Sequence, residues 1–398
     1  MLQEAMEAGT GLGPNYSTDP ENFFQSDRDI ELQRARNAKK AVSESTEARG
    51  SPVPLPSKVL TFELVPGAED IAYIAESGHV ARKLNLKTRK SLAVFRGHSG
   101  PVTSLAIVYS STGEDIALIT GSWDKTIKKW DARTGALIAT FTGHTDFIKE
   151  VLVHNNTLYS ASSDASIRSW DLDTGACIRV FREHTRAVED IAFSDDGVHL
   201  YSASSDTKIK KWDVRSGDVV ATLDSHLTSV YRLVVAEGAL WSASADNTAK
   251  RWDLETNEAD SSFGHPDFVR SLAVFPGGAH LVTGSRDENI RIFDVASEKC
   301  LLTLSGHFGE VSDIKIRGAT IWTSSLDGTI RSWPITDKEL QSTPTAAVAE
   351  LQEQQKRAAD AKAAAKPTVA KPKKKAAVTM TAEEERELAE LMGSDDDE

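Results

Sequence analysis

The sequence predicts an all-β protein assembled from repeated small sheets. The main observation is an aromatic residue followed by Asp or Pro that recurs six times along the 398-residue chain, at spacings of 40, 42, 40, 41 and 40 residues. The six pairs are Trp130-Asp131, Trp170-Asp171, Trp212-Asp213, Trp252-Asp253, Phe293-Asp294 and Trp333-Pro334. A unit of this size cannot bury its apolar faces alone, so we expect the units to stack or to close into a ring.

Three more positions recur when the units are aligned on the aromatic residue. An Asp lies six residues before it, a Ser or Thr lies four residues before the Asp, and a His lies 20 to 26 residues before the Asp. In chain order these sets are His98, Thr120, Asp124 and Trp130; His144, Ser160, Asp164 and Trp170; His184, Ser202, Asp206 and Trp212; His226, Ser242, Asp246 and Trp252; His265, Thr283 and Asp287; and His307, Thr323, Asp327 and Trp333.

Ser, His and Asp together also suggest a hydrolase triad, but six copies argue against one. A triad needs a single strained nucleophile beside a single base. A repeated polar set fits a structural network better, in which Asp accepts a hydrogen bond from His, His reaches the hydroxyl, and the hydroxyl accepts from the indole N–H of Trp.

Short runs rich in β-branched residues predict the strands between these marks. They include residues 102–108, 157–161, 188–193 and 281–284, bounded by Gly, Asp and Ser turns. Further strand-like runs follow the aromatic pairs at residues 136–141, 176–181, 218–223 and 299–304.

These residues resemble the WD-repeat β-propeller family, which carries GH and WD marks and a His–Ser/Thr–Asp–Trp tetrad. The resemblance covers about residues 57–340 and implies four-stranded antiparallel blades around a central channel. We therefore expect a seven-bladed propeller over residues 57–343. Residues 1–56 and 344–398 are expected to be disordered or partly helical tails.

The first of the seven units is degenerate. Residues 69–75 echo residues 114–120, which places Leu84 at the Trp position, Ala75 at the hydroxyl position, and Gly78 or His79 at the Asp position. Without the tetrad, this blade is expected to be the least tightly held. The outer strand that closes the ring has two weak candidates. Residues 339–343 lie at the right offset but are weakly strand-like, and residues 47–52 are less favourable because they contain Gly50 and Pro52.

Composition limits the class of protein. A net charge of −13 argues against general nucleic-acid binding, and no apolar run is long enough for a membrane span. The acidic start of the chain does not resemble a signal peptide, so we expect a cytoplasmic or nuclear protein. The two cysteines, Cys177 and Cys300, lie three blades apart and are expected to be free, buried or half-buried thiols.

No catalytic, cofactor or metal motif survives inspection, so recognition of other proteins is the expected activity. The family resemblance implies that partners dock on the face formed by the loops between blades. We hypothesise a scaffold that assembles a multiprotein complex there, with no small-molecule substrate. The expected contact residues are Trp123, Phe147, Lys149, Tyr231, Phe268, Arg270, Arg286 and Leu326.

Two further patterns leave alternatives open. Arg133 and Arg215 each follow a WD pair in the form WDxR, which resembles the motif by which substrate receptors dock on a cullin–RING ubiquitin ligase adaptor. A base also lies two residues before each aromatic position: Arg82, Lys128, Arg168, Lys210, Lys250, Arg291 and Arg331. These bases suggest either a ring that binds anions or nucleic acid, or strand-edge residues whose long stems cover apolar surface while the charge reaches water, and we favour the second interpretation.

Overall fold

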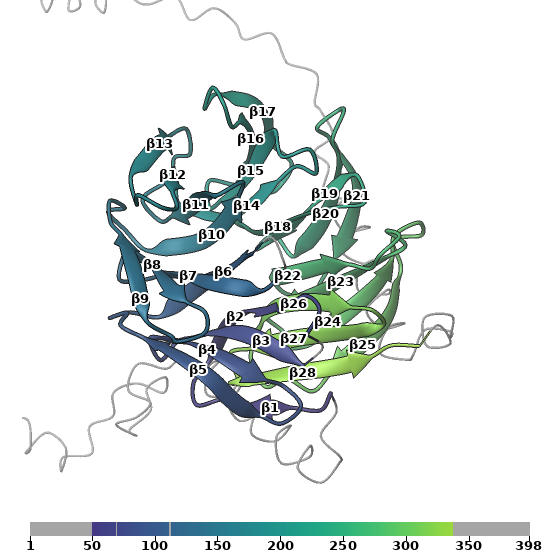
Figure 1. Cartoon of the computed structure of the whole chain (residues 1–398). Helices are drawn as coiled ribbons and strands as arrows, with labels where there is room; N and C mark the ends of the chain where they lie inside the picture. Colours follow the sequence, from purple (N-terminus) through teal and green to yellow (C-terminus); the bar gives the residue numbers. More distant parts are fainter. Residues whose placement is uncertain (1–49, 69, 111–112, 337–398) are drawn as a thin grey trace, which may run out of the picture. The chain divides into compact units, whose positions relative to one another are not determined.

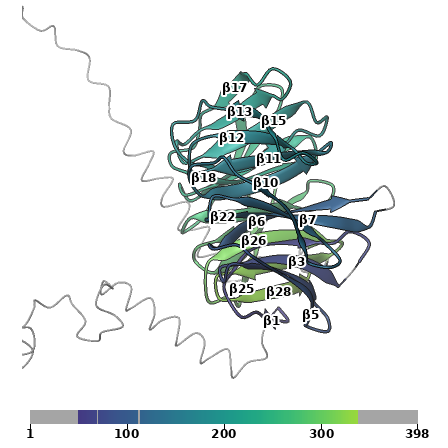
Figure 2. The ribbon, with the colours of Figure 1, turned by 60° about the vertical axis from the view of Figure 1, so that its left-hand side comes forward.

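The computed structural model describes residues 50–336, except residues 69, 111 and 112, and within them the chain forms seven four-stranded antiparallel sheets. The sheets are arranged as the blades of a propeller, with the first strand of each blade toward the centre (Figures 1 and 2). The prediction of a seven-bladed all-β propeller is therefore confirmed.

The strands follow one another through the blades in chain order. Blade one contains β2 (Val59–Leu64), β3 (Ile71–Glu76), β4 (Val80–Asn85) and β5 (Lys90–Arg96). Blade two contains β6 (Val102–Tyr109), β7 (Asp115–Ser122), β8 (Ile127–Asp131) and β9 (Leu137–Phe141), and blade three contains β10 (Ile148–His154), β11 (Thr157–Ser162), β12 (Ile167–Asp171) and β13 (Cys177–Phe181). Blade four contains β14 (Val188–Phe193), β15 (His199–Ser204), β16 (Ile209–Asp213) and β17 (Val219–Leu223), and blade five contains β18 (Val230–Ala236), β19 (Ala239–Ser244), β20 (Thr248–Asp253) and β21 (Ala259–Gly264). Blade six contains β22 (Val269–Val274), β23 (His280–Ser285), β24 (Asn289–Asp294) and β25 (Cys300–Ser305), and blade seven contains β26 (Val311–Arg317), β27 (Thr320–Ser325), β28 (Thr329–Pro334) and β1 (Val53–Pro54).

The core lies between the blades rather than within any one of them. In a representative layer, Ile127 and Phe141 of blade two pack with Ile148, Leu158 and Trp170 of blade three. Burial of each such side chain contributes about 1.5–3 kcal/mol relative to exposure, so each blade depends on its neighbours. This dependence is the physical reason for a closed ring.

The N-terminal side of the chain closes the ring. Val53 and Pro54 pair with Ile330 and Thr329, which places them inside blade seven rather than in the expected tail of residues 1–56. The backbone continues this pairing where Ser332 N–H donates to the Gly50 carbonyl over 2.9 Å.

Gly50 is suited to this junction rather than unfavourable to it. Its φ is +77°, and a Cβ atom there would lie 2.7 Å from the Trp333 ring. Of the two candidates for the closing strand, residues 47–52 lay nearer to β1, and residues 339–343 lie outside the described residues. The predictions for residues 1–49 and 337–398 also lie outside them.

Blade one takes a different register from the one that its sequence echo predicted. Leu84 pairs with Ala72 as Trp130 pairs with Leu118, which confirms Leu84 at the Trp position. The same register places Ile74 opposite Arg82, so Ile74, not Ala75, occupies the hydroxyl position. The alignment of residues 69–75 with residues 114–120 therefore differs by one residue from the alignment that the strand pairing gives.

A β-bulge interrupts the pairing of every outer strand from β5 to β25. In blade two, Trp130 pairs with Leu137 and Lys129 pairs with Ala139, which leaves Ile138 as the extra residue. The residues at this position in blades one to six are Leu92, Ile138, Ile178, Val220, Asp260 and Leu301. A bulge of this kind bends the strand and redirects one side chain.

Candidate functional site

The polar tetrad holds five of the seven blades together in the same way. In blade four, Nδ1–H of His184 donates to Asp206 over 2.8 Å, and Nε2 of His184 lies 2.7 Å from the Ser202 hydroxyl, which also accepts from Nε1–H of Trp212 over 2.7 Å. The corresponding distances in blades two, three, five and seven are 2.7–3.0 Å. Both nitrogens of each of these His rings are therefore engaged within the network, one with the carboxylate and the other with the hydroxyl.

The Asp of each tetrad also fastens two backbone segments. Asp206 accepts from the N–H of Thr185 over 3.0 Å and from that of Lys208 over 3.1 Å. Burial alone would raise the pKa of Asp206, but the hydrogen bond and charge interaction with His184 outweigh burial and hold the pKa well below 3.8. The carboxylate is therefore a stable structural acceptor.

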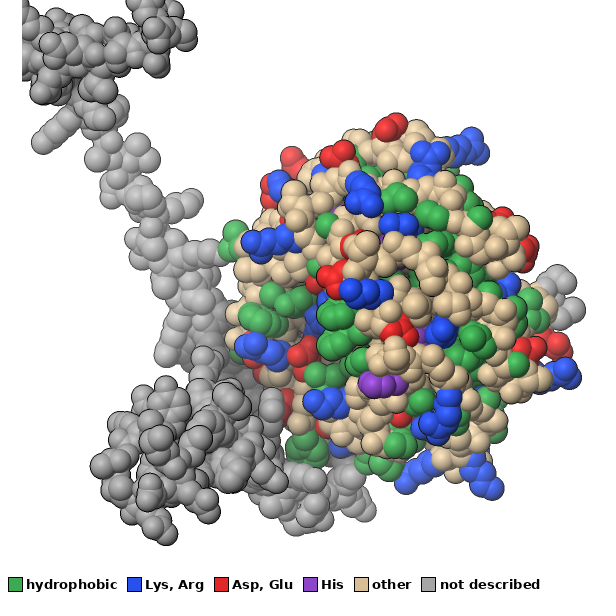
Figure 3. Space-filling model, turned by 90° about the vertical axis from the view of Figure 1, so that its left-hand side faces the viewer, with side chains coloured by type: hydrophobic (Ala, Val, Ile, Leu, Met, Phe, Trp, Pro, Cys, Tyr) green, Lys and Arg blue, Asp and Glu red, His purple; other side chains and the backbone are tan. Residues whose placement is uncertain are grey.

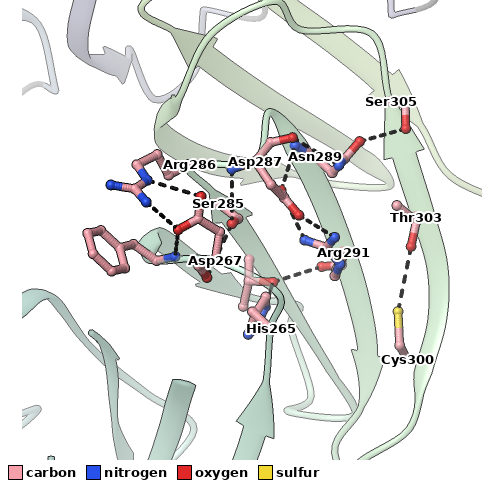
Figure 4. A network of polar contacts seen from close by, with 12 residues as sticks. His265, Asp267, Ser285, Arg286, Asp287, Asn289, Arg291, Cys300, Thr303 and Ser305 are labelled. Carbon is pink, nitrogen blue, oxygen red and sulfur yellow. Dashed lines mark hydrogen bonds and ion pairs between the residues drawn. The ribbon is translucent and has the colours of Figure 1, made fainter. Parts of the chain in front are cut away.

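Blade six departs from the predicted tetrad. Asp287 binds Nη1 and Nη2 of Arg291, over 3.2 and 2.5 Å, instead of His265 (Figure 4). His265 keeps its 2.7 Å contact with Thr283, but its Nδ1–H donates to the Phe263 carbonyl over 3.0 Å.

The sequence of blade six explains this departure. Phe293 has no indole N–H, and Pro266, directly after the His, has no backbone N–H to offer to the carboxylate. Arg291 supplies the missing donors. Burial, with the positive charge of Arg291 nearby, lowers the pKa of His265 to about 3, so this ring stays neutral.

Blade one also replaces the tetrad, here with a partly buried ion pair. Nε of Arg82 lies 2.6 Å from the Glu76 carboxylate, which also accepts from the Ser57 hydroxyl over 2.9 Å. Arg82 and Arg291 thus turn inward in the two blades that lack Trp. Arg291 and Arg331 are buried, so the favoured interpretation of this base position, with the charge in water, is wrong for these residues.

The structure brings seven of the eight expected loop-face residues to one pocket of about 710 Å³. They are Trp123, Lys149, Tyr231, Phe268, Arg270, Arg286 and Leu326. The eighth, Phe147, stacks on Trp123 with 5.2 Å between ring centroids and 18° between ring planes. Both of these aromatic side chains are exposed, by 43% for Trp123 and 38% for Phe147.

The cations of this face are already paired. The Arg270 guanidinium lies over the Tyr231 ring at 4.3 Å and binds Glu310 over 3.2 Å. Arg286 covers the Phe268 ring at 3.9 Å and binds Asp267 over 2.8 Å, as Figure 4 shows for the ion pair.

Lys149 likewise binds Glu189 of the next blade over 3.1 Å. Reasoning from the sequence did not predict that these three cations would be paired with acids. Their pairing leaves the Trp123–Phe147 stack as the most exposed apolar feature among the expected contact residues.

A cluster of charges lies at the base of this pocket. The Arg232 guanidinium is 3.1 Å from Glu150, 3.7 Å from Asp190 and 3.6 Å from Asp313, which come from blades three, four and seven. Lys315 lies 3.7 Å from Asp313 and also binds Glu63. Glu150, Arg232 and Lys315 also line a second pocket of about 440 Å³.

Acids outnumber bases in this central cluster, and burial raises the pKa of two of its carboxyls, Asp190 and Glu150. Burial outweighs the attraction of Arg232 and, with the charges of Asp190 and Asp313, raises the pKa of Glu150 to about 8. The cluster had a sequence signal that we did not use. The sixth residue after each repeat His is polar in all six units: Ser104, Glu150, Asp190, Arg232, Ser271 and Asp313.

The two WDxR arginines lie in turns outside this pocket. The Asp131 carboxylate accepts from the N–H of Arg133 over 3.0 Å, and the Asp213 carboxylate accepts from that of Arg215 over 2.8 Å. Both arginines are exposed. Cys300 is buried as expected, but Cys177 is exposed on β13 because its side chain projects from an outer strand.

Comparison with known proteins agrees with this geometry. The family described as "WD domain, G-beta repeat" matches residues 89–131, 135–171, 175–213, 259–294 and 298–334. The chain belongs to the WD40-repeat family. The matched segments do not include residues 214–258, yet blade five contains a complete tetrad.

Three relatives illustrate the range of similarity. An uncharacterised WD repeat-containing protein of Schizosaccharomyces pombe is 29% identical over 337 residues, covering 80% of this chain and 90% of that protein. F-box/WD repeat-containing protein 10 of Mus musculus is 38% identical over 74 residues, covering 18% of this chain and 7% of that protein. Ribosome biogenesis protein BOP1 of Homo sapiens is 49% identical over 41 residues, covering 10% of this chain and 6% of that protein.

Each family repeat is offset from the blades by one strand. The match at residues 298–334 runs from the outer strand of blade six through the first three strands of blade seven. The fourth strand of blade seven therefore has to come from elsewhere in the chain, and β1 provides it. Among residues 50–336, with the gaps given above, we find no helical segment of the length and apolarity that a membrane span requires.

Proposed function

We propose that this protein is a non-enzymatic scaffold that assembles a multiprotein complex through the loop face of its propeller. The observation that carries this proposal is the exposed Trp123–Phe147 stack at the rim of the large pocket. Aromatic side chains of this kind supply much of the binding energy at protein interfaces. WD40 propellers are generally interaction modules without catalytic activity, which supports the proposal.

The arrangement of charge suggests how a partner binds this face. Since Arg270, Arg286 and Lys149 already have carboxylate partners, a ligand gains little by offering each of them a new acid. We expect aromatic and aliphatic side chains of the partner to supply most of the affinity. The charged rim then guides the encounter and fixes orientation.

Affinity purification from the native host, followed by mass spectrometry, tests this proposal. The bait pair is the wild-type chain and the Trp123→Ala/Phe147→Ala variant, with Tyr109→Ala as the control. Tyr109 is another exposed aromatic residue, 37% accessible, and it lines the second pocket rather than the first.

The loop-face variant should lose the principal partner by about tenfold, which is about 1.4 kcal/mol, and should keep its melting temperature. Tyr109→Ala should keep the partner. If the loop-face variant retains every partner of the wild type, the docking surface lies elsewhere.

A second candidate is a substrate receptor of a cullin–RING ubiquitin ligase. The matched turn geometry and the exposure of Arg133 and Arg215, two blades apart, favour it. A pull-down with wild-type bait that never contains the ligase adaptor removes this candidate. If the adaptor is present, Arg133→Ala/Arg215→Ala should release it without unfolding the chain.

We place this activity in the cytoplasm or nucleus. The partners that we propose are proteins, with no direct contact to membrane or nucleic acid. Fractionation of the tagged chain from its native host, before and after nuclease treatment, tests both statements.

A further inference from the structure

Four consecutive blades expose an aliphatic side chain at the same structural position. Leu92, Ile138, Ile178 and Val220 are the bulge residues of blades one to four, and they are 53–58% exposed. We call these four residues the bulge band. Exposed aliphatic residues are common on proteins when scattered, but this set recurs in register on adjacent blades.

The side of the ring that carries the outer strands β9 and β13 is apolar in places. Figure 3 faces this side and shows apolar side chains gathered beside Lys and Arg side chains. Leu137 and Val180 add to the exposed aliphatic surface on β9 and β13.

Blade five shows, within the same chain, which group complements this position. Its bulge residue is Asp260, which binds Arg251 over 3.0 Å, and Arg251 directly precedes the blade Trp. In blades two and four the residues before Trp are also basic, Lys129 and Lys211, but the bulge residues there are aliphatic. Their blades therefore lack the acid that blade five supplies at the bulge.

The basic groups of blades two to four are held mainly by neutral acceptors. Lys129 Nζ donates to the Leu172 carbonyl over 3.0 Å, lies 3.8 Å from the exposed Asp173 carboxylate, and also interacts electrostatically with the Asp171 carboxylate. Arg179 binds the carbonyls of the turn after Trp212, and Lys211 lies 5.7 Å from the centre of the Tyr201 ring. Lys129 and Lys211 thus each have a nearby carboxylate, which for Lys211 is Asp196, whereas the hydrogen bonds of Arg179 go to neutral carbonyls.

We propose that the bulge band binds a partner protein through a segment that alternates aliphatic and acidic side chains. The aliphatic groups pack against Leu92, Ile138, Ile178 and Val220, and the carboxylates complement Lys129, Arg179 and Lys211. The proposal does not rest on the loop face or on the partner proposed for it.

The geometry selects the manner of binding. The bulges interrupt the edge of each outer strand where these side chains project, so continuous strand addition is blocked there and the contact is made by side chains. Adjacent blades are also rotated by one seventh of a turn. A flat surface touches only one or two outer edges of such a ring, whereas a segment that wraps around the rim reaches all four blades.

A displayed random-peptide library, selected against the full-length chain, tests this inference. Selected peptides of the aliphatic–acidic class are then titrated into the wild type and into Ile138→Ser/Ile178→Ser. The matched control is Ile116→Ser, because Ile116 is 50% exposed but lies on β7, outside the band. Trp123→Ala/Phe147→Ala separates this site from the loop face.

The bulge variant should lose about tenfold in affinity for these peptides, while the Ile116 and loop-face variants bind as the wild type does. Unchanged affinity of the bulge variant, or no enrichment of the class, overturns the proposal. Two other results also overturn it by naming a different occupant. One is binding of phosphatidylserine vesicles that the bulge variant alone loses, and the other is self-association of the wild type that the bulge variant alone loses.

Discussion

Removal of one tetrad carboxylate measures how much these networks stabilise the propeller. Asp206→Ala leaves Nδ1–H of His184 without its acceptor, and the His184 side chain is only 1% exposed. An unsatisfied buried donor costs about 1–3 kcal/mol, and loss of the two backbone contacts adds to it, so we expect a loss of roughly 3 kcal/mol. For a domain of this size, that corresponds to a melting temperature roughly 5 °C lower.

Asp195→Ala is the matched control for this measurement. It makes the same substitution at an exposed site in the same blade. Urea unfolding followed by Trp fluorescence measures both variants, and hydrogen exchange tests whether the added opening lies in blade four. Asp195→Ala should change stability by less than about 0.5 kcal/mol. Equal losses in the two variants would refute the assigned role of the tetrad.

The pH dependence provides a second test of the same carboxylate. Because the folded-state pKa of Asp206 lies below the ordinary value of 3.8, its contribution is fully present above pH 3.8 and is lost as the pH falls below that value. The stability difference between wild type and Asp206→Ala should therefore be constant from neutral pH to about pH 5 and shrink on further acidification. A difference that grows on acidification contradicts this assignment.

Three more predictions concern Glu150 in the charge cluster, the closure of the ring by β1, and the two cysteine thiols. The pKa of Glu150 is raised from 4.5 to about 8, so its ionisation destabilises the fold as the pH rises through that range. Glu150→Gln should remove this loss of stability between melting curves recorded at pH 6 and at pH 9. A variant with the same pH dependence as the wild type contradicts this prediction. Deleting residues 1–55 should open β28 to hydrogen exchange, whereas deleting residues 1–49 keeps β1 and should not; equal protection shows that β1 does not hold the blade. Cys177 should react rapidly with a thiol reagent in the native state and Cys300 only after unfolding, because burial raises the pKa of Cys300; two rapid thiols contradict this.

The sequence was sufficient for the architecture because the repeat constrains the same positions many times. The Trp, Asp, Ser/Thr and His marks place each network at defined strand positions, and their contacts recur in five blades. Blade six differs for local reasons. The sequence contained the relevant signals, Pro266 after the His and Phe293 in place of Trp, but a contact between Arg291 and Asp287 depends on how the side chains turn inside the blade.

The ring closure and the charge cluster were harder to predict for another reason. β1 has only two residues, one of them Pro54, so it lacks the strand pattern that identifies longer strands. Arg232 meets Glu150, Asp190 and Asp313 only because the ring brings three distant blades to one axis. The repeat shows that these positions are equivalent in their blades, but it does not show that their side chains come into contact at the centre of the ring.

The pairing of β1 with β28 has a mechanical consequence. The two strands run antiparallel, so Gly50 and Thr336 lie at the same end of the pair. Tension applied between these two residues breaks the hydrogen bonds between β1 and β28 one at a time, starting from this end. Only then does the force act on the other six blades. A single-molecule pulling experiment from these residues should show a small early release, followed by a larger force for the rest of the propeller. We therefore expect the β1–β28 pair in blade seven to separate before the rest of the propeller.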